Sequence, residues 1–186
     1  MRKSLFHRIN FLTVLFLLVS IGLFAQKINT EKSSVKFEIG GLVWSTVEGE
    51  IKGMSGSFIF DKNNLSFSFF NVCIDPKTVF TDDEKRDTHL KEPDFFNTLK
   101  HTNICFKSTN VTKSKDSFHV IGKLTLVGIT KSIEFDFKSI NESGVLVLVG
   151  ELEINRFDFG LAAESYSSTM MVGKEVIIKI RCVFLD

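Results

Sequence analysis

The residues of this chain that could perform acid–base or nucleophilic chemistry are few, and their spacing is poor. Asp87 and His89 could serve as an acid and a base, and Ser45 or Ser108 as a nucleophile. Side chains two positions apart on a helix point in different directions, so Asp87 and His89 do not form a pair there. The sequence has neither a nucleophile elbow nor the Cys and His spacing of a zinc site. We therefore predict a protein that is not an enzyme, with no catalytic residues, metal ligands or catalytic cofactor.

A second polar group consists of Arg86, Asp87 and His89 in "RDTHLKEPDFF" and of Arg156 and Asp158 in "INRFDFG". A guanidinium group pairs well with phosphate-like oxygens, so Arg86 and Arg156 are candidates to bind a polar or anionic head group. This hypothesis requires the five residues to lie at the mouth of a ligand cavity. In the structural alternative, Arg86 and Asp87 fix a loop and Arg156 pairs with Asp158.

Three cysteines leave at least one thiol unpaired within the chain. If the strand that ends near Ile74 pairs antiparallel with the strand that begins near Ile104, Cys73 and Cys105 come close enough for a disulfide. Cys182 would then remain free.

The elements that must position these residues are mainly β-strands. Apolar and polar residues alternate in "SVKFEI", "SFIF", "FHVIGKLTLV", "IEFDF" and "EVIIKIRCVF", a period typical of half-buried strands. The same pattern predicts a strand through residues 65–69, and its change of phase at Phe69 and Phe70 predicts a bulge. One short helix is expected at residues 82–90, before Pro93. The predicted fold is all-β: a single antiparallel up-and-down barrel of about eight strands with this helical insertion, or a closely related sandwich.

The inward-facing residues of these strands would line the interior of the barrel. The chain has 20 phenylalanines but one tryptophan and one tyrosine. An eight-stranded barrel is just wide enough to be filled by its side chains, or to hold one ligand. The residues predicted to line a cavity are Phe37, Ile39, Phe58, Phe60, Phe67, Phe106, Phe118, Val120, Leu124, Phe135, Phe137, Ile178 and Ile180.

The N-terminal residues have the features of an export signal. Arg2, Lys3 and Arg8 carry positive charge, residues 9–24 are apolar and uncharged, and Ala25 suits cleavage. We expect residues 1–25 to be a signal peptide and residues 26–186 one barrel domain, periplasmic or alternatively secreted. Removing the signal changes the formal net charge from +1 to about −2, which excludes a basic footprint for nucleic acid.

Four motifs in order, "RDTHLKEPDFFN", "ICFKST", "GKLTLVGITK" and "INRFDFG", resemble the signatures of the YceI-like family. The resemblance extends over residues 34–184. It implies an exported protein with a lipocalin-like barrel that binds a long polyisoprenoid or a similar amphiphile, with no catalytic chemistry common to the fold. The chain departs from the family pattern at Gly41 and Val43, and the usual "DFFD" reads "DFFN".

The expected function is therefore that of an exported carrier of an apolar lipid. A transient membrane contact is compatible with this role, and the chain could be a monomer or a homodimer. One alternative ligand is an isoprenoid quinone, which would connect the carrier to membrane redox chemistry. Another alternative is a barrel filled by phenylalanine that serves as a structural or interaction module, for example through Met170 and Met171 in an expected loop.

Overall fold

The chain forms a curled antiparallel β-sheet. The computed structural model describes residues 26–41, 46–162 and 172–185, and within them nine strands follow the order β2-β1-β9-β8-β7-β6-β5-β4-β3. The strands are β1 (Ser34–Gly41), β2 (Thr46–Ile51), β3 (Ser55–Ile59), β4 (Phe69–Ile74), β5 (Ile104–Ser114), β6 (Ser117–Leu126), β7 (Ile129–Glu142), β8 (Val145–Asn155) and β9 (Val172–Val183). The short helices are η1 (Leu65–Phe67), η2 (Pro76–Thr78), α2 (Glu84–Leu90) and η3 (Arg156–Phe159).

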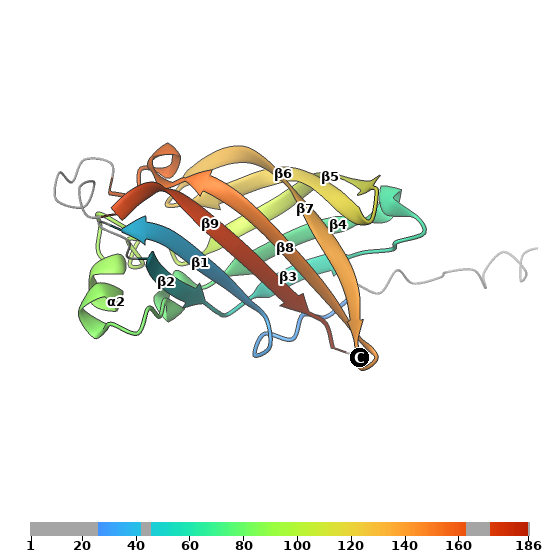
Figure 1. Ribbon diagram of the computed structural model, residues 1–186, viewed down its shortest axis with the longest axis horizontal. Coiled ribbons are helices and arrows are strands. Elements are labelled where there is room, and N and C mark those ends of the chain that lie inside the picture. The colour runs from blue at the N-terminus through green and yellow to red at the C-terminus, as the bar shows by residue number, and fades with distance from the viewer. Residues whose placement is uncertain (1–25, 42–45, 163–171, 186) are drawn as a thin grey trace, which may run out of the picture.

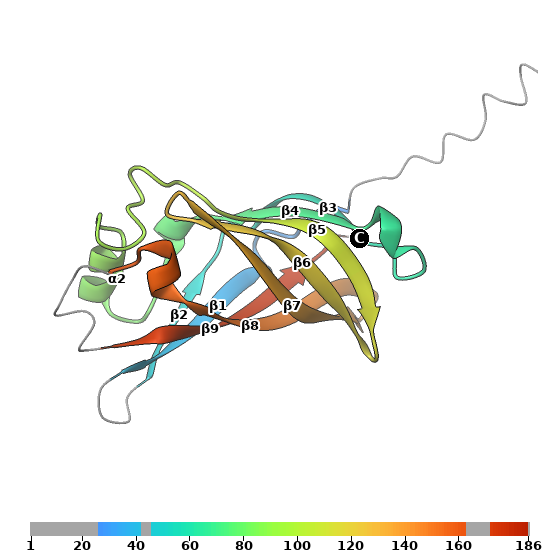
Figure 2. The same ribbon diagram turned by 90° about the horizontal axis from the view of Figure 1, so that it is seen from above.

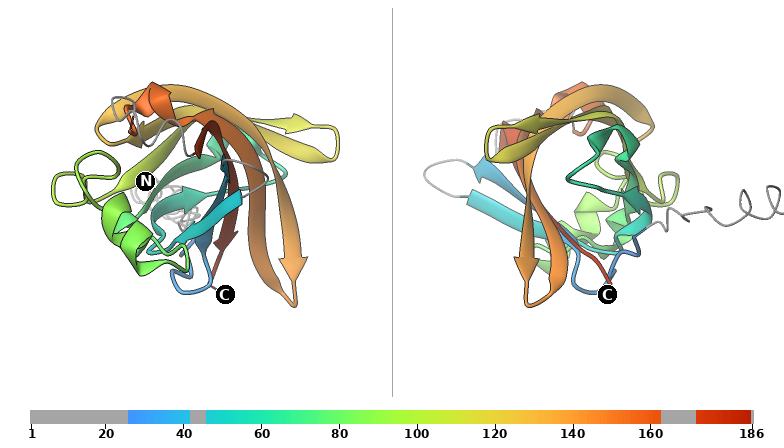
Figure 3. Two further views of the ribbon diagram at one scale, coloured as in Figure 1. Left: turned by 60° about the vertical axis from the view of Figure 1, so that its left-hand side comes forward. Right: turned by 90° about the vertical axis from the view of Figure 1, so that its right-hand side faces the viewer.

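The sheet curls around an interior, which is clearest when the molecule is viewed nearly end-on (Figure 3). Helix α2 lies at one end of the long axis, and the hairpin between β5 and β6 lies at the other end (Figures 1 and 2). The all-β antiparallel prediction is confirmed, with nine strands in place of about eight. No helix in the described ranges is long and apolar enough to cross a membrane.

Strands β2 and β3 lie at opposite edges of the sheet order, although only residues 52–54 separate them in sequence. Gly53 makes the turn between them with a φ of 73°, a conformation that glycine adopts without steric cost. The chain therefore stops pairing with β1 after Ile51, the last residue of β2, and begins to pair with β4 at Ser55, the first residue of β3. This connection ties the two edges of the sheet together covalently.

Three isolated bridges add further pairing, and two of them involve the edge strands β2 and β3. Gln26 pairs with Phe58 on β3, and Glu50 on β2 pairs with Phe80 in the segment that follows β4. A third bridge joins Ile28 to Phe184, just beyond β9. Among the described residues β2 and β3 form no ladder with each other, so the ends of the curl meet through these short contacts.

The predicted helix is α2, and Asp83 caps it by accepting the backbone N–H of Arg86 at 3.0 Å. The predicted strand through residues 65–67 is wrong, because these residues form the 3₁₀ turn η1. Strand β4 begins only at Phe69 and pairs with β3 without a shift of register, so the predicted bulge at Phe69 and Phe70 is wrong too. The change of phase in the sequence marks the start of the strand.

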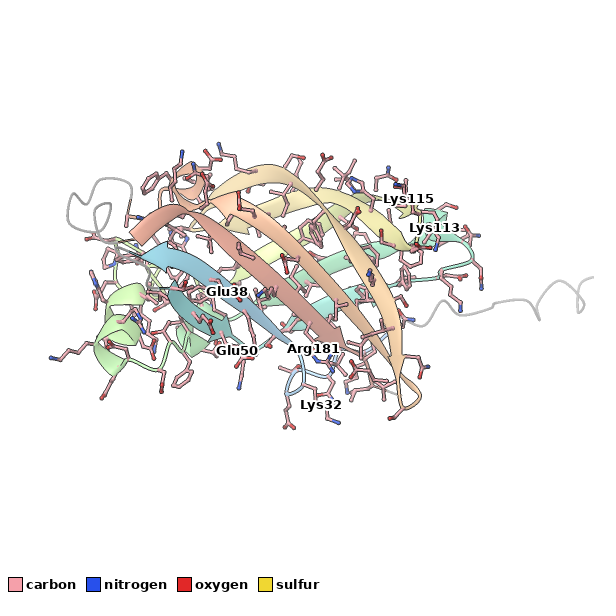
Figure 4. All side chains as sticks on the ribbon, in the orientation of Figure 1. Lys32, Glu38, Glu50, Lys113, Lys115 and Arg181 are labelled. Atoms are coloured by element: carbon pink, nitrogen blue, oxygen red, sulfur yellow. A yellow bond between two sulfur atoms is a disulfide. The ribbon has the colours of Figure 1, made fainter. Side chains whose placement is uncertain are left out.

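Side chains alternate across the sheet as predicted. On β1, Phe37 and Ile39 face the interior, whereas Glu38 lies on the outer face and forms an ion pair with Lys179 of β9. Arg181 of β9 also lies on the outer face, where two of its nitrogens donate to the carboxylate of Glu142 at 2.9 and 2.5 Å. Figure 4 shows Glu38 and Arg181 among the charged side chains that cover this face.

The predicted disulfide is present. Cys73 on β4 and Cys105 on β5 are directly paired, with Cα atoms 4.1 Å apart and their sulfurs bonded. Their neighbours Val72 and Phe106 line the interior, so the alternation places the disulfide on the outer face. Cys182 is free and buried. The expected signal peptide, Ser45, Met170 and Met171 lie outside the described residues.

Candidate ligand-binding cavity

The interior of the curled sheet contains a cavity of about 720 Å³ with a predominantly apolar lining. This volume is within the range of small-molecule sites. Polar lining residues gather at the end that carries α2: they are Asp83, Lys85, Arg86, His89 and Arg156. Because Asp83, Lys85 and His89 are themselves exposed, the cavity reaches the surface there. We call this end the mouth. Phe95 and Phe96, in the segment after α2, line the cavity at the same end.

Nine of the residues predicted to line a cavity do so. They are Phe37, Ile39, Phe58, Phe106, Leu124, Phe135, Phe137, Ile178 and Ile180. They come from six strands, and on each strand the inward position follows the period of two. The interior is therefore not wholly filled by phenylalanine.

Four predicted lining residues are elsewhere. Phe60, Phe118 and Val120 are buried but face packed core at the end opposite the mouth, where aromatic rings leave no free space for them to line. Phe67 is wrong in a different way, because it belongs to η1 and is 57% exposed. Alternation identified the inward face of a strand but not the depth of each residue along the interior.

Several lining residues were missed by the sequence reasoning. Met54 follows the turn at Gly53 and is only 2% exposed, yet no strand pattern includes it. Leu148 lies where β8 is apolar on both faces, so its direction was ambiguous. Phe70 lines the cavity and Phe69 does not. The alternation of Val72 and Ile74 continues in phase with Phe70, so the sequence already indicated that Phe70 faces inward.

At the mouth, Arg86 and Asp87 both hold Thr81. Arg86 donates from Nε to the Thr81 hydroxyl and from Nη2 to the Thr81 carbonyl, each at 2.7 Å. The Asp87 carboxylate accepts the Thr81 hydroxyl at 2.6 Å and the Thr81 amide at 2.8 Å. Asp87 does not line the cavity, so its predicted place facing a head group is wrong: its carboxylate is turned to the loop. Arg86 both fixes this loop and lines the cavity.

Arg156 combines structural contacts with a place in the cavity wall. It is 4% exposed, and it donates from Nε to the carbonyl of Gly173 at 2.9 Å and from Nη1 to the carbonyl of Leu161 at 2.8 Å. Burial lowers the pKa of the guanidinium below its ordinary value. The predicted pairing with Asp158 is wrong, because no ion pair joins the two residues in the described part of the chain. Asp158 does not line the cavity either, since it lies beyond Arg156 on η3.

The residues considered for catalysis are used otherwise. The ring of His89 packs edge-on against Phe95 with centroids 4.9 Å apart, while the Asp87 carboxylate is bound to Thr81. The hydroxyl oxygen of Ser108 accepts the backbone N–H of Phe70 at 2.9 Å, at a point where β5 shifts register against β6. These contacts position the wall and the mouth of the cavity.

Cys182 lines the deep part of the cavity, and burial raises the pKa of its thiol to about 12. A thiol with such a pKa is overwhelmingly protonated near neutral pH and is a weak nucleophile. It contributes to the cavity as a small apolar surface.

A curled antiparallel sheet around an apolar cavity, with polar side chains at one open end, defines a lipocalin-like class of binding protein. The chain belongs to the YceI-like family, whose domain matches residues 26–184. A UPF0312 protein of Pectobacterium atrosepticum is 37% identical over 108 residues, which cover 58% of this chain and 56% of that protein. The chain thus spans little more than half the length of that relative. Protein YceI of Escherichia coli O17:K52:H18 is 35% identical over 144 residues, which cover 76% of this chain and 75% of that protein.

Solved structures have the same fold. BcnA of Burkholderia cenocepacia superposes with a TM-score of 0.78 at 22% identity, over 84% of this chain and 98% of that one. A polyisoprenoid binding domain from Saccharophagus degradans, implicated in plant cell wall breakdown, superposes with a TM-score of 0.69 at 13% identity, over 86% of this chain and 97% of that one. At such low identity these likenesses show the fold alone.

Proposed function

We propose that this chain is an exported, non-catalytic carrier that holds a polyisoprenoid or a similar amphiphilic lipid. The observation that carries the proposal is the apolar cavity of about 720 Å³, which reaches the surface at a polar mouth. The ligand's tail would occupy the cavity and its head would stay at the mouth. The polyisoprenoid binding domain with the same fold supports this choice of ligand.

The physical chemistry favours a long apolar tail. Each buried methylene contributes roughly 0.8 kcal/mol, so about 20 enclosed carbons contribute on the order of 16 kcal/mol. The loss of translational freedom and the ordering of the tail on binding together cost roughly 4 to 15 kcal/mol. Binding is then favourable without a strong polar contact, and related lipids should compete with one another.

The head group is proposed to meet Arg86, His89 and Arg156, which line the mouth. Guanidinium groups suit an anionic or oxygen-rich head, such as a phosphate or the carbonyls of a quinone. An isoprenoid quinone has the same kind of tail, so only the head group separates the two ligands. A transient contact with a membrane would let the tail transfer without crossing water.

The compartment is proposed to be the periplasm, with secretion as the alternative. The disulfide between Cys73 and Cys105 supports an oxidising location, since such bonds are rare in reducing cytosol. The export signal expected in residues 1–25 agrees with it.

Native mass spectrometry tests the proposal. The chain is purified from its exported compartment without detergent, any bound molecule is extracted with solvent and identified, and the stripped protein is then offered a prenyl alcohol. A stoichiometric isoprenoid supports the carrier. A protein that is bare and takes up no added isoprenoid would refute it.

A pair of neighbouring substitutions supplies the control. Ile178→Glu places a carboxylate in the apolar wall and should abolish uptake, because a charge without a partner there is costly. Lys179→Gln changes the adjacent, outward position without placing a second carboxylate beside Glu38 and should bind normally. Equal uptake by the two folded variants would mean that the lipid does not occupy this cavity.

A further inference from the structure

The end of the cavity opposite the mouth is closed by six phenylalanine side chains that pack against one another. They are Phe58, Phe60, Phe70, Phe118, Phe137 and Phe184, each 7% exposed or less. They come from β3, β4, β6 and β7 and from the residues just after β3 and β9, so they meet across the interior from nearly all sides. We call this group the aromatic plate.

The plate has two layers. Phe58, Phe70 and Phe137 line the cavity and form its floor, with the rings of Phe58 and Phe70 stacked at a centroid distance of 4.4 Å and 7° from parallel. Phe60 and Phe118 lie behind the floor, in edge contact at 4.9 Å, and do not line the cavity. A tail that reaches the floor therefore meets a second layer of rings and no outlet.

Hydrogen bonds hold the plate in place. The amide side chain of Gln26 accepts the backbone N–H of Phe60 at 3.1 Å and donates to the carbonyl of Phe60 at 3.3 Å. The Ser108 hydroxyl accepts the backbone N–H of Phe70 at 2.9 Å. Rings anchored at their backbones and packed on several sides cannot move aside for a longer tail without breaking these contacts.

We propose that the aromatic plate acts as a ruler that sets the longest isoprenoid tail the chain can enclose. This inference rests on the proposed carrier function and adds a class of ligand to it: tails of middle length. At about 30 Å³ for each water-sized group, a cavity of about 720 Å³ has room for at most roughly 24 such groups. Because this volume includes the mouth, the enclosed tail is at most about four to five isoprene units long. Each added unit strengthens binding while it is enclosed, and carbons beyond that length stay in water and add nothing.

Two substitutions move the floor in opposite directions. Phe70→Ala removes one ring of the floor and lengthens the cavity toward Phe60 by about the volume of one isoprene unit. Leu148→Phe adds a ring to the wall near the floor and shortens the cavity. Leu148 is paired with Cys182 on the neighbouring strand β9. Phe67→Ala is the matched control, since Phe67 is exposed on η1 and does not line the cavity.

The experiment measures the Kd of each full-chain protein, stripped of lipid, for a series of all-trans prenyl alcohols from farnesol to solanesol. For the unsubstituted chain and for Phe67→Ala, affinity should rise at least about tenfold per isoprene unit and then level off near the tail length given by the cavity. The plateau should move about one unit longer in Phe70→Ala and about one unit shorter in Leu148→Phe.

Thermal unfolding identifies variants that have lost their fold, and Phe70→Leu replaces Phe70→Ala if the larger truncation unfolds the chain. Affinity that continues to rise up to solanesol, or a plateau that stays fixed in both folded variants, would overturn the ruler while leaving the carrier intact. An unsubstituted chain that binds no member of the series would overturn the carrier function, and the ruler with it.

Discussion

Arg86 holds Thr81 through two hydrogen bonds of 2.7 Å, one to its hydroxyl and one to its carbonyl. Thr81 is 6% exposed and lies between the bridge at Phe80 and the start of α2. The helix at the mouth is therefore fastened to the edge of the sheet by an arginine that also faces the cavity. The shape of the mouth and the proposed contact with a head group therefore depend on the same side chain.

Arg86→Ala is expected to lower the free energy of unfolding by about 1 to 2 kcal/mol, because two hydrogen bonds of a charged donor are lost at a half-buried site. Denaturant unfolding measures this loss. Hydrogen exchange at the Thr81 amide should also accelerate. Lys85→Ala, the neighbouring change at the mouth, should leave both quantities nearly unchanged. If Arg86→Ala matches Lys85→Ala in both, the arginine does not fasten the loop.

Reduction of the disulfide between Cys73 and Cys105 is expected to destabilise the fold by about 3 to 4 kcal/mol, since the bond closes a loop with a sequence separation of 32. Unfolding curves with and without a thiol reductant measure the difference. The double variant Cys73→Ala, Cys105→Ala should have the lower stability under both conditions. A reductant effect that persists in the double variant would point to another cause.

His119 is expected to make stability depend on pH. Its Nδ1 lies 2.8 Å from the Asp136 carboxylate on the neighbouring strand, and this hydrogen bond is the main reason that its pKa is raised above 6.5. Since the folded pKa is the higher one, the contribution is full below pH 6.5 and is lost as the pH rises through the folded value. Because the Asp136 side chain is 56% exposed and that of His119 is 32% exposed, solvent screens the pair and the contribution is about 1 kcal/mol or less.

The comparison for His119 is the unfolding free energy of the unsubstituted chain and of His119→Gln between about pH 5 and pH 8.5. The gap between the two proteins should be widest at the acidic end and should shrink as the pH rises. In an Asp136→Asn background the same gap should be smaller at every pH. A gap that widens with rising pH would show that the sign is wrong.

Gly122 is a position where one methyl group should alter the cavity. A Cβ there would lie 2.4 Å from a ring atom of Phe106, which lines the cavity, and 2.6 Å from the carbonyl oxygen of Lys107. Gly122→Ala is expected to cost about 1 to 3 kcal/mol and to reduce lipid uptake, as the ring is driven inward. Gly40→Ala is the control, with nothing within 4 Å of its Cβ. Equal stability and uptake in the two variants would contradict the close packing.

The alternation of residues predicted which face of each strand turns inward, because one face contacts apolar interior and the other contacts water. It therefore placed Phe37 and Ile178 correctly. It did not distinguish Phe58, at the floor, from Phe60, behind it, since depth along the interior depends on strand tilt and on register with neighbours distant in sequence.

Local hydrogen bonding also produced a turn where the alternation of residues predicted a strand. The run that includes Phe67 alternates like a strand, but the Ser66 hydroxyl donates to the Asn64 side chain at 2.6 Å and the backbone turns into η1. Arg156 was recognised as a polar residue of interest, yet its contact with the carbonyl of Gly173 joins positions 17 apart in the sequence. It depends on how β9 lies beside β8, which no short-range pattern predicts.

The short strands at the two ends of the sheet order have a consequence for behaviour at high concentration. Strand β2 has six residues and β3 has five, and Phe80 and Gln26 occupy part of their free sides. Long unpaired strands are templates on which other chains add and aggregate. Short, partly covered edges therefore offer another copy of the chain few free backbone groups on which to add a strand.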